Sequence, residues 1–330
     1  MYLKSGLGFL LSTYKDLFNV CKHLSGNNLW GGVKTSIDAL YCLFVYGSIF
    51  TEYEALNFKE RSHANRKTFV TVIWLLKQLE KYNPMEYRHI FHDKIIFNET
   101  FQDYIGRKWL SIPHCTHQQI TTFIGESKRF VLKNSSGCSG KQVYVTTGKE
   151  SKEGLLSLIN SGKYNLIEEI LENCEQIKDL NPTSLNTIRV VTIHGDNYFK
   201  VICAALRIGA KGSNVDNVSQ GGTAARINVE TGKIDSLFFA NSYREHANSQ
   251  KGRNEIGFDI PFWKETISML EKASRLVPEI HVVGWDVAIT ENGPAIIEGN
   301  ESFHTVIMQM YADTNSPGLK YEFSEALQHI

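Results

Sequence analysis

The sequence has little of what marks several large classes of protein. Only 7 Pro and 25 Gly occur among 330 residues, which argues against a disordered linker or a collagen-like chain. Lys plus Arg and Asp plus Glu both number 35, so the chain as a whole has no electrostatic preference for nucleic acid. With 42% hydrophobic residues the chain can bury a large core, and its length corresponds to about two domains.

Paired cysteines and long apolar runs are also missing. The six cysteines lie far apart and form no Cys-x-x-Cys motif, so we expect reduced thiols and a cytoplasmic location. The uncharged stretch from Ala39 to Phe50 covers 12 residues, short of the ~20 that span a bilayer, and predicts no transmembrane helix. Its aromatic residues leave peripheral membrane contact open. The segment 1–20 has no small-residue cleavage site, so we do not expect a signal peptide.

Two kinds of pattern divide the chain. Residues 1–92 carry apolar residues at helical spacing, and Asn83-Pro84 ends the last predicted helix of this part. After residue 128, short β-branched runs alternate with turn signals. They predict strands at 129–132, 142–145, 165–170, 187–194, 198–207, 225–229 and 281–289, with one clear helix at 261–276. We therefore predict an α+β fold of antiparallel hairpins that follows a helical N-terminal region.

The segment 282–300 carries the most informative motif. Two apolar strands flank a three-residue loop, 291–293, and the resulting hairpin pairs Thr290 with Pro294, Ala288 with Ile296, and Asp286 with Glu298. Opposed carboxylates among apolar neighbours repel, and a bound cation would remove the repulsion. Asn300 returns to the face of Glu298. We therefore predict Asp286, Glu298 and Asn300 as Mg²⁺ ligands, with a protonated or Lys-paired carboxylate as the alternative.

A second motif follows the predicted strand at 129–132. Lys133 ends this strand, and the loop 134–141 consists mainly of small residues. Such a loop can direct backbone N–H groups at phosphate oxygens, with the lysine as counter-charge. The loop matches neither a Walker loop nor a dinucleotide-binding turn, and alone it is equally compatible with a structural role.

Together with the segment Asn165–Leu171 between them, the two motifs resemble those of the ATP-grasp ligases. The resemblance implies two α+β subdomains that clasp ATP between antiparallel sheets. It places a helical N-terminal region at 1–92, a small subdomain with the Gly/Ser phosphate loop at 93–170, and a C-terminal subdomain with the Mg²⁺ hairpin at 171–330. ATP and Mg²⁺ are the implied cofactors.

The resemblance also implies roles for individual residues. Lys94 and Lys133 correspond to the two phosphate-binding lysines, and Glu168 would reach the adenine amine. The ribose ligand would be Glu172 or Glu175, and the choice stays open. The complete set of implied nucleotide contacts is Lys94, Lys133, Ser139, Gly140, Glu168, Glu169, Leu171 and Glu175.

A narrower likeness is to the sugar-transfer-associated branch of the ATP-grasp superfamily, which is found with polysaccharide biosynthesis enzymes. The segments that carry it are 184–192, 206–209, 215–217, Gly221-Gly222 and the N-terminal stretches 46–48 and 51–53. In this reading Arg189 and Arg207 would bind a γ-phosphate and a substrate carboxylate, one each. Asn217 and Gly221-Gly222 would close over the transferred group. His304 is the candidate general base.

The leading hypothesis is an ATP-dependent, ADP-forming ligase that makes C–N (amide) bonds through an acyl phosphate. Its partners would be a small-molecule or glycan-linked carboxylate, a uronic-acid sugar in capsule or O-antigen assembly, and an amino acid or other amine. No nucleic-acid partner is expected. The alternatives are a sugar phosphotransferase and a non-catalytic ATP-binding scaffold for glycosyltransferases.

Overall fold

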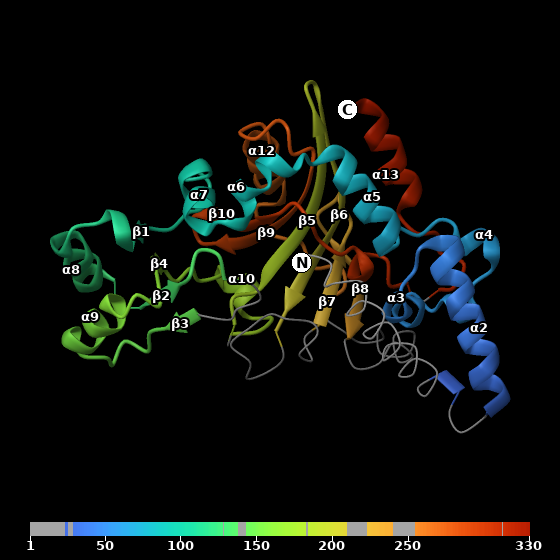
Figure 1. Ribbon diagram of the computed structural model, residues 1–330, viewed down its shortest axis with the longest axis horizontal. Helices are drawn as coiled ribbons and strands as arrows, with labels where there is room; N and C mark the ends of the chain where they lie inside the picture. Colours follow the sequence, from blue (N-terminus) through green and yellow to red (C-terminus); the bar gives the residue numbers. More distant parts are fainter. Residues whose placement is uncertain are drawn as a thin grey trace.

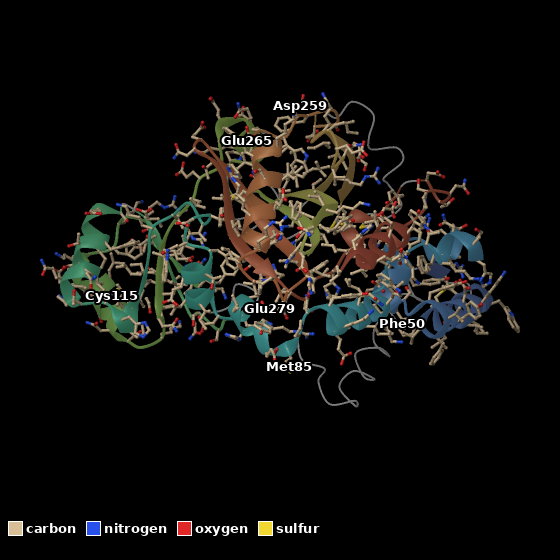
Figure 2. All side chains as sticks on the ribbon, turned by 90° about the horizontal axis from the view of Figure 1, so that it is seen from above. Phe50, Met85, Cys115, Asp259, Glu265 and Glu279 are labelled. Atoms are coloured by element: carbon tan, nitrogen blue, oxygen red, sulfur yellow. The ribbon has the colours of Figure 1, made fainter. Side chains whose placement is uncertain are left out.

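The computed structural model describes residues 24–25, 29–127, 129–137, 143–182, 184–209, 223–239, 255–311 and 313–330. A six-stranded antiparallel sheet lies at the centre, with a four-stranded sheet at one end and the N-terminal helices at the other (Figure 1). From above, Cys115 near the small sheet and Phe50 in the N-terminal helices lie at opposite ends (Figure 2).

The N-terminal region is helical, as predicted. Its helices are α2 (Leu29–Tyr46), α3 (Phe50–Ala55), α4 (His63–Arg66) and α5 (Val72–Tyr82). Helix α5 ends just before Asn83-Pro84, where the sequence indicated a stop. The buried carboxylate of Glu52 accepts hydrogen bonds from the backbone amides of Ile49 (3.2 Å) and Val72 (2.9 Å), at the starts of α3 and α5. One carboxylate therefore fixes two helix N-termini.

Short helices lead from this region into the four-stranded sheet. They are α6 (His89–His92) and α7 (Lys94–Thr100), and the sheet has the order β1-β4-β2-β3. Its strands are β1 (Trp109–Ser111), β2 (Phe130–Lys133), β3 (Val143–Val145) and β4 (Leu166–Glu169). Helices α8 (His117–Glu126) and α9 (Lys152–Asn160) pack apolar side chains against β2 and β4. The sequence predicted β2, β3 and β4 but not β1, α8 or α9.

The six-stranded sheet has the order β10-β9-β5-β6-β7-β8. Its strands are β5 (Thr187–Gly195), β6 (Tyr198–Ile208), β7 (Thr223–Ile227), β8 (Ile234–Phe239), β9 (Val282–Thr290) and β10 (Gly293–Asn300). The short helix α10 (Glu175–Lys178) precedes it. Strand β8 was not predicted, whereas the other five agree with the sequence patterns to within a few residues.

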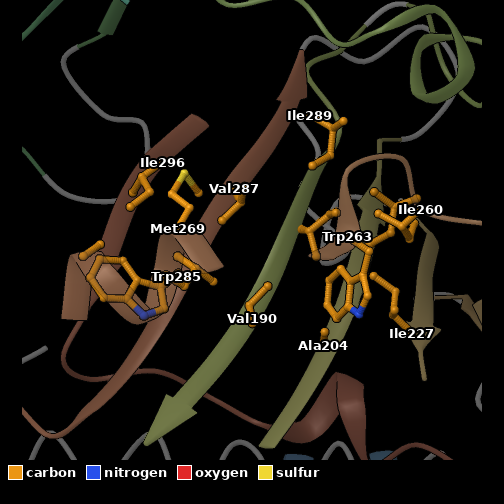
Figure 3. Packing of buried hydrophobic residues seen from close by; sticks show 14 of the residues in the cluster. Val190, Ala204, Ile227, Ile260, Trp263, Met269, Trp285, Val287, Ile289 and Ile296 are labelled. Atoms are coloured by element: carbon orange, nitrogen blue, oxygen red, sulfur yellow. The ribbon is translucent and has the colours of Figure 1, made fainter. Parts of the chain in front are cut away.

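Side chains alternate between the two faces of this large sheet. Val190, Trp285 and Val287 face α12 (Trp263–Ser274), and Met269 and Trp263 of that helix lie over them (Figure 3). Val191 and Ile193 face the other side, toward α5 and α13 (Lys320–Ala326). The α+β class with a helical N-terminal region is thus confirmed. Among the described helices, none combines the length and the apolar character that a bilayer crossing requires.

Candidate active site

The hairpin of β9 and β10 brings the predicted metal ligands together, but by a different register from the one expected. The turn has two residues, Glu291 and Asn292, so Thr290 pairs with Gly293, and Ala288 with Ala295. The predicted pairs Thr290–Pro294 and Ala288–Ile296 are therefore wrong by one position. A β-bulge then makes Ile297 an extra residue, and beyond it Glu298 does stand opposite Asp286. Without the bulge, Ile297 would face Asp286.

Asp286 is buried and held by two arginines from the neighbouring strands. Arg189 of β5, its direct cross-strand partner, donates from Nε to Oδ1 (2.5 Å) and from its terminal nitrogen to Oδ2 (3.0 Å). Arg207 of β6 lies 2.9 Å from Oδ2. Burial alone would raise the pKa of Asp286, but the two guanidinium groups hold it at about 2. The two arginines therefore already neutralise the negative charge of Asp286, whereas the sequence predicted that a bound cation would do so.

Glu298 is in a different electrostatic position. Its pKa is raised, first by burial and then by the Asp286 carboxylate, to which the Glu298 carboxyl hydrogen-bonds. The charges of Arg189 and Lys94 act in the opposite direction but do not cancel the rise. The raised pKa favours a proton on Glu298 that bonds to Asp286, and a divalent cation would compete with this proton for the same oxygens.

The donor set of this hairpin fits a Mg²⁺ ion. Asn300 pairs with Gly284 and donates its side-chain amide to the Gly284 carbonyl (3.3 Å), which leaves its own carbonyl oxygen as an acceptor. Two carboxyl groups and an amide oxygen are hard ligands of the kind that Mg²⁺ binds together with substrate phosphates. Within the described ranges, no three His, Cys, Asp or Glu side chains gather as a metal cluster, so the protein would supply only part of the ligand shell.

A second buried carboxylate, Glu168, lies on β4 of the small sheet. Its oxygens accept from Lys133 of β2 (2.5 Å), Arg107 (3.0 Å) and Asn98 of α7 (2.7 Å). Although burial opposes ionisation, the charges of Arg107 and Lys133 lower the pKa of Glu168 to about 2. Lys133 and Glu168, predicted separately for phosphate and adenine, are therefore one ion pair.

Lys94 ties α7 to the start of the Gly/Ser loop. Its amine donates to the carbonyls of Gly137 (2.6 Å) and Ser135 (3.3 Å), and its backbone amide also donates to Ser135. Its charge also acts on Glu298 of the β9–β10 hairpin, where it lowers the pKa. Ser139 and Gly140 fall outside the described residues.

The predicted ribose contacts line a pocket of about 730 Å³ beside the segment that follows β4. Leu171, Glu172 and Glu175 all border it, opposite the Glu291-Asn292 turn. Glu172 pairs with Lys178 at 3.0 Å, whereas the backbone amide of Glu175 donates to the Glu291 carboxylate at 2.8 Å. Both candidates thus stay on the same pocket, and the choice between them stays open.

Comparison with known proteins identifies the family. A family model described as sugar-transfer associated ATP-grasp matches residues 77–325. The chain belongs to this family. The match begins within α5 and ends within α13, and thus includes both sheets and both buried carboxylates.

Several solved structures are similar to this chain, all at low sequence identity. The ATP-grasp ligase PsnB, complexed with a minimal precursor, has a TM-score of 0.46 at 14% identity over 78% of this chain and 69% of its own. D-alanyl-alanine synthetase A from Vibrio cholerae has a TM-score of 0.41 at 11% identity over 72% of this chain and 65% of its own. No curated protein sequence matches the chain significantly. The family match, over residues 77–325, confirms the predicted ATP-grasp fold.

The remaining predicted residues of this ATP-grasp protein divide into three groups. His304 follows the end of β10 by four residues, and partial burial, followed by the charge of Arg189, lowers its pKa. Glu169 is the last residue of the inner strand β4, and its carboxylate accepts from the Lys108 amide at 3.0 Å. Asn217, Asp216 and Gly221-Gly222 lie outside the described residues.

Sequence reasoning missed two residues of the site, Arg107 and Asn98. Both contact Glu168, and Arg107 also contacts strand β10 of the β9–β10 hairpin. Asn98 lies in α7, beyond the helical region predicted for residues 1–92, and Arg107 lies in a turn before an unpredicted strand. The one local signal was Gly106, whose positive φ of 60° marks a sharp turn immediately before the arginine.

Proposed function

We propose that this protein is an ATP- and Mg²⁺-dependent ligase that joins a carboxylate to an amine through an acyl phosphate, with release of ADP. The observation that carries the proposal is the pairing of Asp286 with Glu298 beside the guanidinium groups of Arg189 and Arg207. Phosphoryl transfer needs mainly positioning and neutralisation of charge, and this arrangement offers both.

Each residue has a definite task in this proposal. Lys94 and Lys133 neutralise nucleotide phosphates, and one of the two arginines orients the substrate carboxylate by a bidentate contact. Asp286, Glu298 and Asn300 would hold the Mg²⁺ ion, which supplies charge neutralisation on the transferred phosphoryl group. His304 accepts the proton of the attacking amine, because its lowered pKa keeps the imidazole neutral at pH 7.

The substrate class belongs to the same proposal. The sugar-transfer association of the family supports a carboxylate on a sugar, and a uronic acid is the sugar that carries one. We propose that the enzyme amidates such a sugar with an amino acid or another amine during assembly of a capsule or O-antigen polysaccharide in the cytoplasm.

Product analysis tests this function. The protein is incubated with ATP, MgCl₂, mixed uronic-acid sugars and mixed amino acids, and the products are examined by mass spectrometry. We expect a product whose mass equals sugar plus amine minus water, formed together with ADP and phosphate. The variant Glu298→Gln should reduce product formation by at least about 100-fold, because it loses one of the charges on which phosphoryl transfer depends. A phosphorylated sugar formed without an amine would instead identify a phosphotransferase.

A further inference from the structure

The side chain of Arg107 contacts both halves of the proposed site. It lies between α7 and β1, its side chain is 4% exposed, and its guanidinium group reaches three separate parts of the chain. Toward the small sheet it donates to Glu168 (3.0 Å) and to Asn98 (3.4 Å). Toward the large sheet it donates to the carbonyls of Ile296 (2.9 Å) and Ile297 (3.2 Å).

The contacts on the large sheet fall on the β-bulge of β10. Ile297 is the extra residue of that bulge, and the bulge is what sets Glu298 opposite Asp286. A bulge interrupts the strand ladder, so its carbonyls need other donors. Arg107 supplies such donors to two consecutive carbonyls, and it thereby stabilises the register on which the proposed metal site depends.

The turn around Arg107 is fitted closely to the same strand. The Ile296 amide donates to the Tyr104 carbonyl at 2.8 Å, and a Cβ added to Gly106 would lie 2.8 Å from the Cβ of Ala295. Helix α7 lies beside β10, and the chain then continues through this turn to β1 (Figure 1). The position of Arg107 relative to the bulge is therefore fixed by backbone contacts as well as by its side chain.

On the small sheet, Arg107 acts on the nucleotide end of the proposed site. It shares Glu168 with Lys133, whose amine lies 2.5 Å from the other carboxylate oxygen. Without Arg107 the buried Glu168 would retain Lys133 as its one cationic contact among the described partners, so Lys133 would be drawn more strongly toward the carboxylate and away from phosphate.

We propose that Arg107 is a positioning residue that couples nucleotide binding at Lys133 and Glu168 to metal binding at Glu298. This inference rests on the proposed ATP and Mg²⁺ site. The coupling follows from one rigid guanidinium group whose geometry must satisfy the β10 bulge and the Glu168 carboxylate together. An ordered Glu298, as in a metal-bound site, would stabilise the neighbouring β10 bulge. The carbonyls of the bulge would then hold Arg107 in one position. Arg107 would in turn hold Glu168 and keep Lys133 in place to bind the phosphates.

Titration calorimetry with AMP-PNP, in MgCl₂ and in EDTA, measures this coupling. In the unaltered protein we expect Mg²⁺ to tighten AMP-PNP binding by about tenfold or more, and in Arg107→Gln we expect about twofold or less. Arg107→Lys keeps the charge beside Glu168 but cannot reproduce the planar fork, so it should bind AMP-PNP better than Arg107→Gln and still show weakened coupling. Equal coupling in the unaltered protein and in folded Arg107→Lys would overturn the proposal.

Two control variants separate positioning from general damage. Asn98→Ala removes a hydrogen bond to Glu168 and the long contact (3.4 Å) from Arg107, but it leaves both Arg107 bonds to the hairpin carbonyls, so it should weaken AMP-PNP binding by a similar factor with and without Mg²⁺. Arg61→Lys alters another buried arginine, which donates to the Leu56 and Thr314 carbonyls and to neither Glu168 nor the β10 bulge, and should leave the coupling unchanged. Loss of coupling in Arg61→Lys would show that any destabilisation suffices and would refute the specific role of Arg107.

A readout without metal or nucleotide completes the test. Hydrogen exchange of the amides at 297–300 should be faster in both Arg107 variants than in the unaltered protein and in Arg61→Lys, because the bulge has lost its donors. Unchanged exchange there would contradict the proposal. Absence of AMP-PNP binding in the unaltered protein would instead remove the proposed ATP site, and the coupling with it.

Discussion

The protein keeps two carboxylates buried and ionised, Glu168 in the small sheet and Asp286 in the large one, and they differ in where their cations come from. Glu168 is held by Arg107 and Lys133, which lie on a turn and a strand. Asp286 is held by Arg189 and Arg207, which lie on neighbouring strands of its own sheet. Both carboxyl groups have a pKa of about 2.

The difference lies in what stands next to each carboxylate. Glu168 has no second acidic side chain among its recorded hydrogen-bond partners, whereas Asp286 faces Glu298, whose pKa is raised. Glu168 therefore completes a closed network that joins parts of the fold. Asp286 and Glu298 together carry an acidic group that is only partly compensated, which is the property that a cation site requires.

The largest effect is expected from Asp286→Asn, which removes the carboxylate shared by two arginines. We expect turnover to fall by at least about 10³-fold, and the free energy of unfolding to fall by about 3 kcal/mol because breaking a buried ion pair leaves the partner charges poorly compensated. Denaturant titration and phosphate release measure the two effects. Asp259→Asn, an exposed carboxylate paired with Lys233 at the surface, is the control and should change neither.

The equivalent substitution in the small sheet, Glu168→Gln, should reduce stability less than Asp286→Asn does and should mainly weaken nucleotide binding. The amide oxygen still accepts from Asn98 and Arg107, so we expect a stability loss of about 2 kcal/mol and a nucleotide affinity at least about tenfold lower. Glu169→Gln on the same strand is the control, because the nucleotide contact implied for Glu169 is made by its backbone and its carboxylate is only half-buried. Equal affinities for the two variants would show that the Glu168 network is structural only.

His194 provides a third buried ionisable group to compare with Glu168 and Asp286. Its neighbours carry the same charge as its own protonated form, so burial and neighbours both favour the neutral ring. Burial, His281 and Arg275 lower its pKa from 6.5 to about 4. As the pH falls, His194 therefore takes up a proton in the unfolded chain at a higher pH than in the folded protein. The contribution of neutral His194 to the free energy of unfolding is fully present above pH 6.5 and decreases as the pH falls toward 4. From pH 7.5 to pH 5 we expect a loss of about 2 kcal/mol. Denaturant titrations at both pH values should show a smaller loss in His194→Phe, while the exposed His329→Gln should behave like the unaltered protein.

The larger strands and the carboxylate pair could be predicted because their signals are local. Runs of β-branched residues mark β5, β6 and β9, and the apolar sequences around Asp286 and Glu298 predict a hairpin. The helices α8 and α9 also had local signals that were overlooked. Thr116 and Gln119 form a capping box at the start of α8, and Ser151 caps α9 by accepting the Gly154 amide.

The rest depends on contacts between distant parts of the chain. The predicted three-residue turn was wrong, and the pairing of Asp286 with Glu298 was nevertheless right because the bulge at Ile297 restores the lost position. No local pattern announces that bulge, since it is stabilised by Arg107, which lies 190 positions away from Ile297 in the chain. Arg189 and Arg207 were predicted to bind a γ-phosphate and a substrate carboxylate, and their bonds to Asp286 became visible only in the folded sheet.

The smallest stability effect, and the sharpest contrast with Asp286→Asn, is expected from Glu298→Gln. The raised pKa of Glu298 means that the folded, metal-free protein binds this proton more tightly than the unfolded chain does, so this stabilisation is present at low pH and is lost as the pH rises through the folded pKa. A glutamine cannot ionise and can still donate to the Asp286 carboxylate. In EDTA, Glu298→Gln should therefore match the unaltered protein within about 1 kcal/mol at acidic pH and equal or exceed its stability at pH 8.

Addition of MgCl₂ reverses that order if the carboxylate pair binds the ion. A ligand that binds only the folded state raises stability, so the unaltered protein should gain about 1 kcal/mol or more at Mg²⁺ concentrations well above its Kd, and Glu298→Gln should gain little. Thermal unfolding in EDTA and in MgCl₂ measures both gains. If Glu298→Gln gained as much as the unaltered protein, the ion would be bound elsewhere. Asp286 and its two arginines would then form a closed network like that of Glu168, and the contrast between the two sheets would disappear.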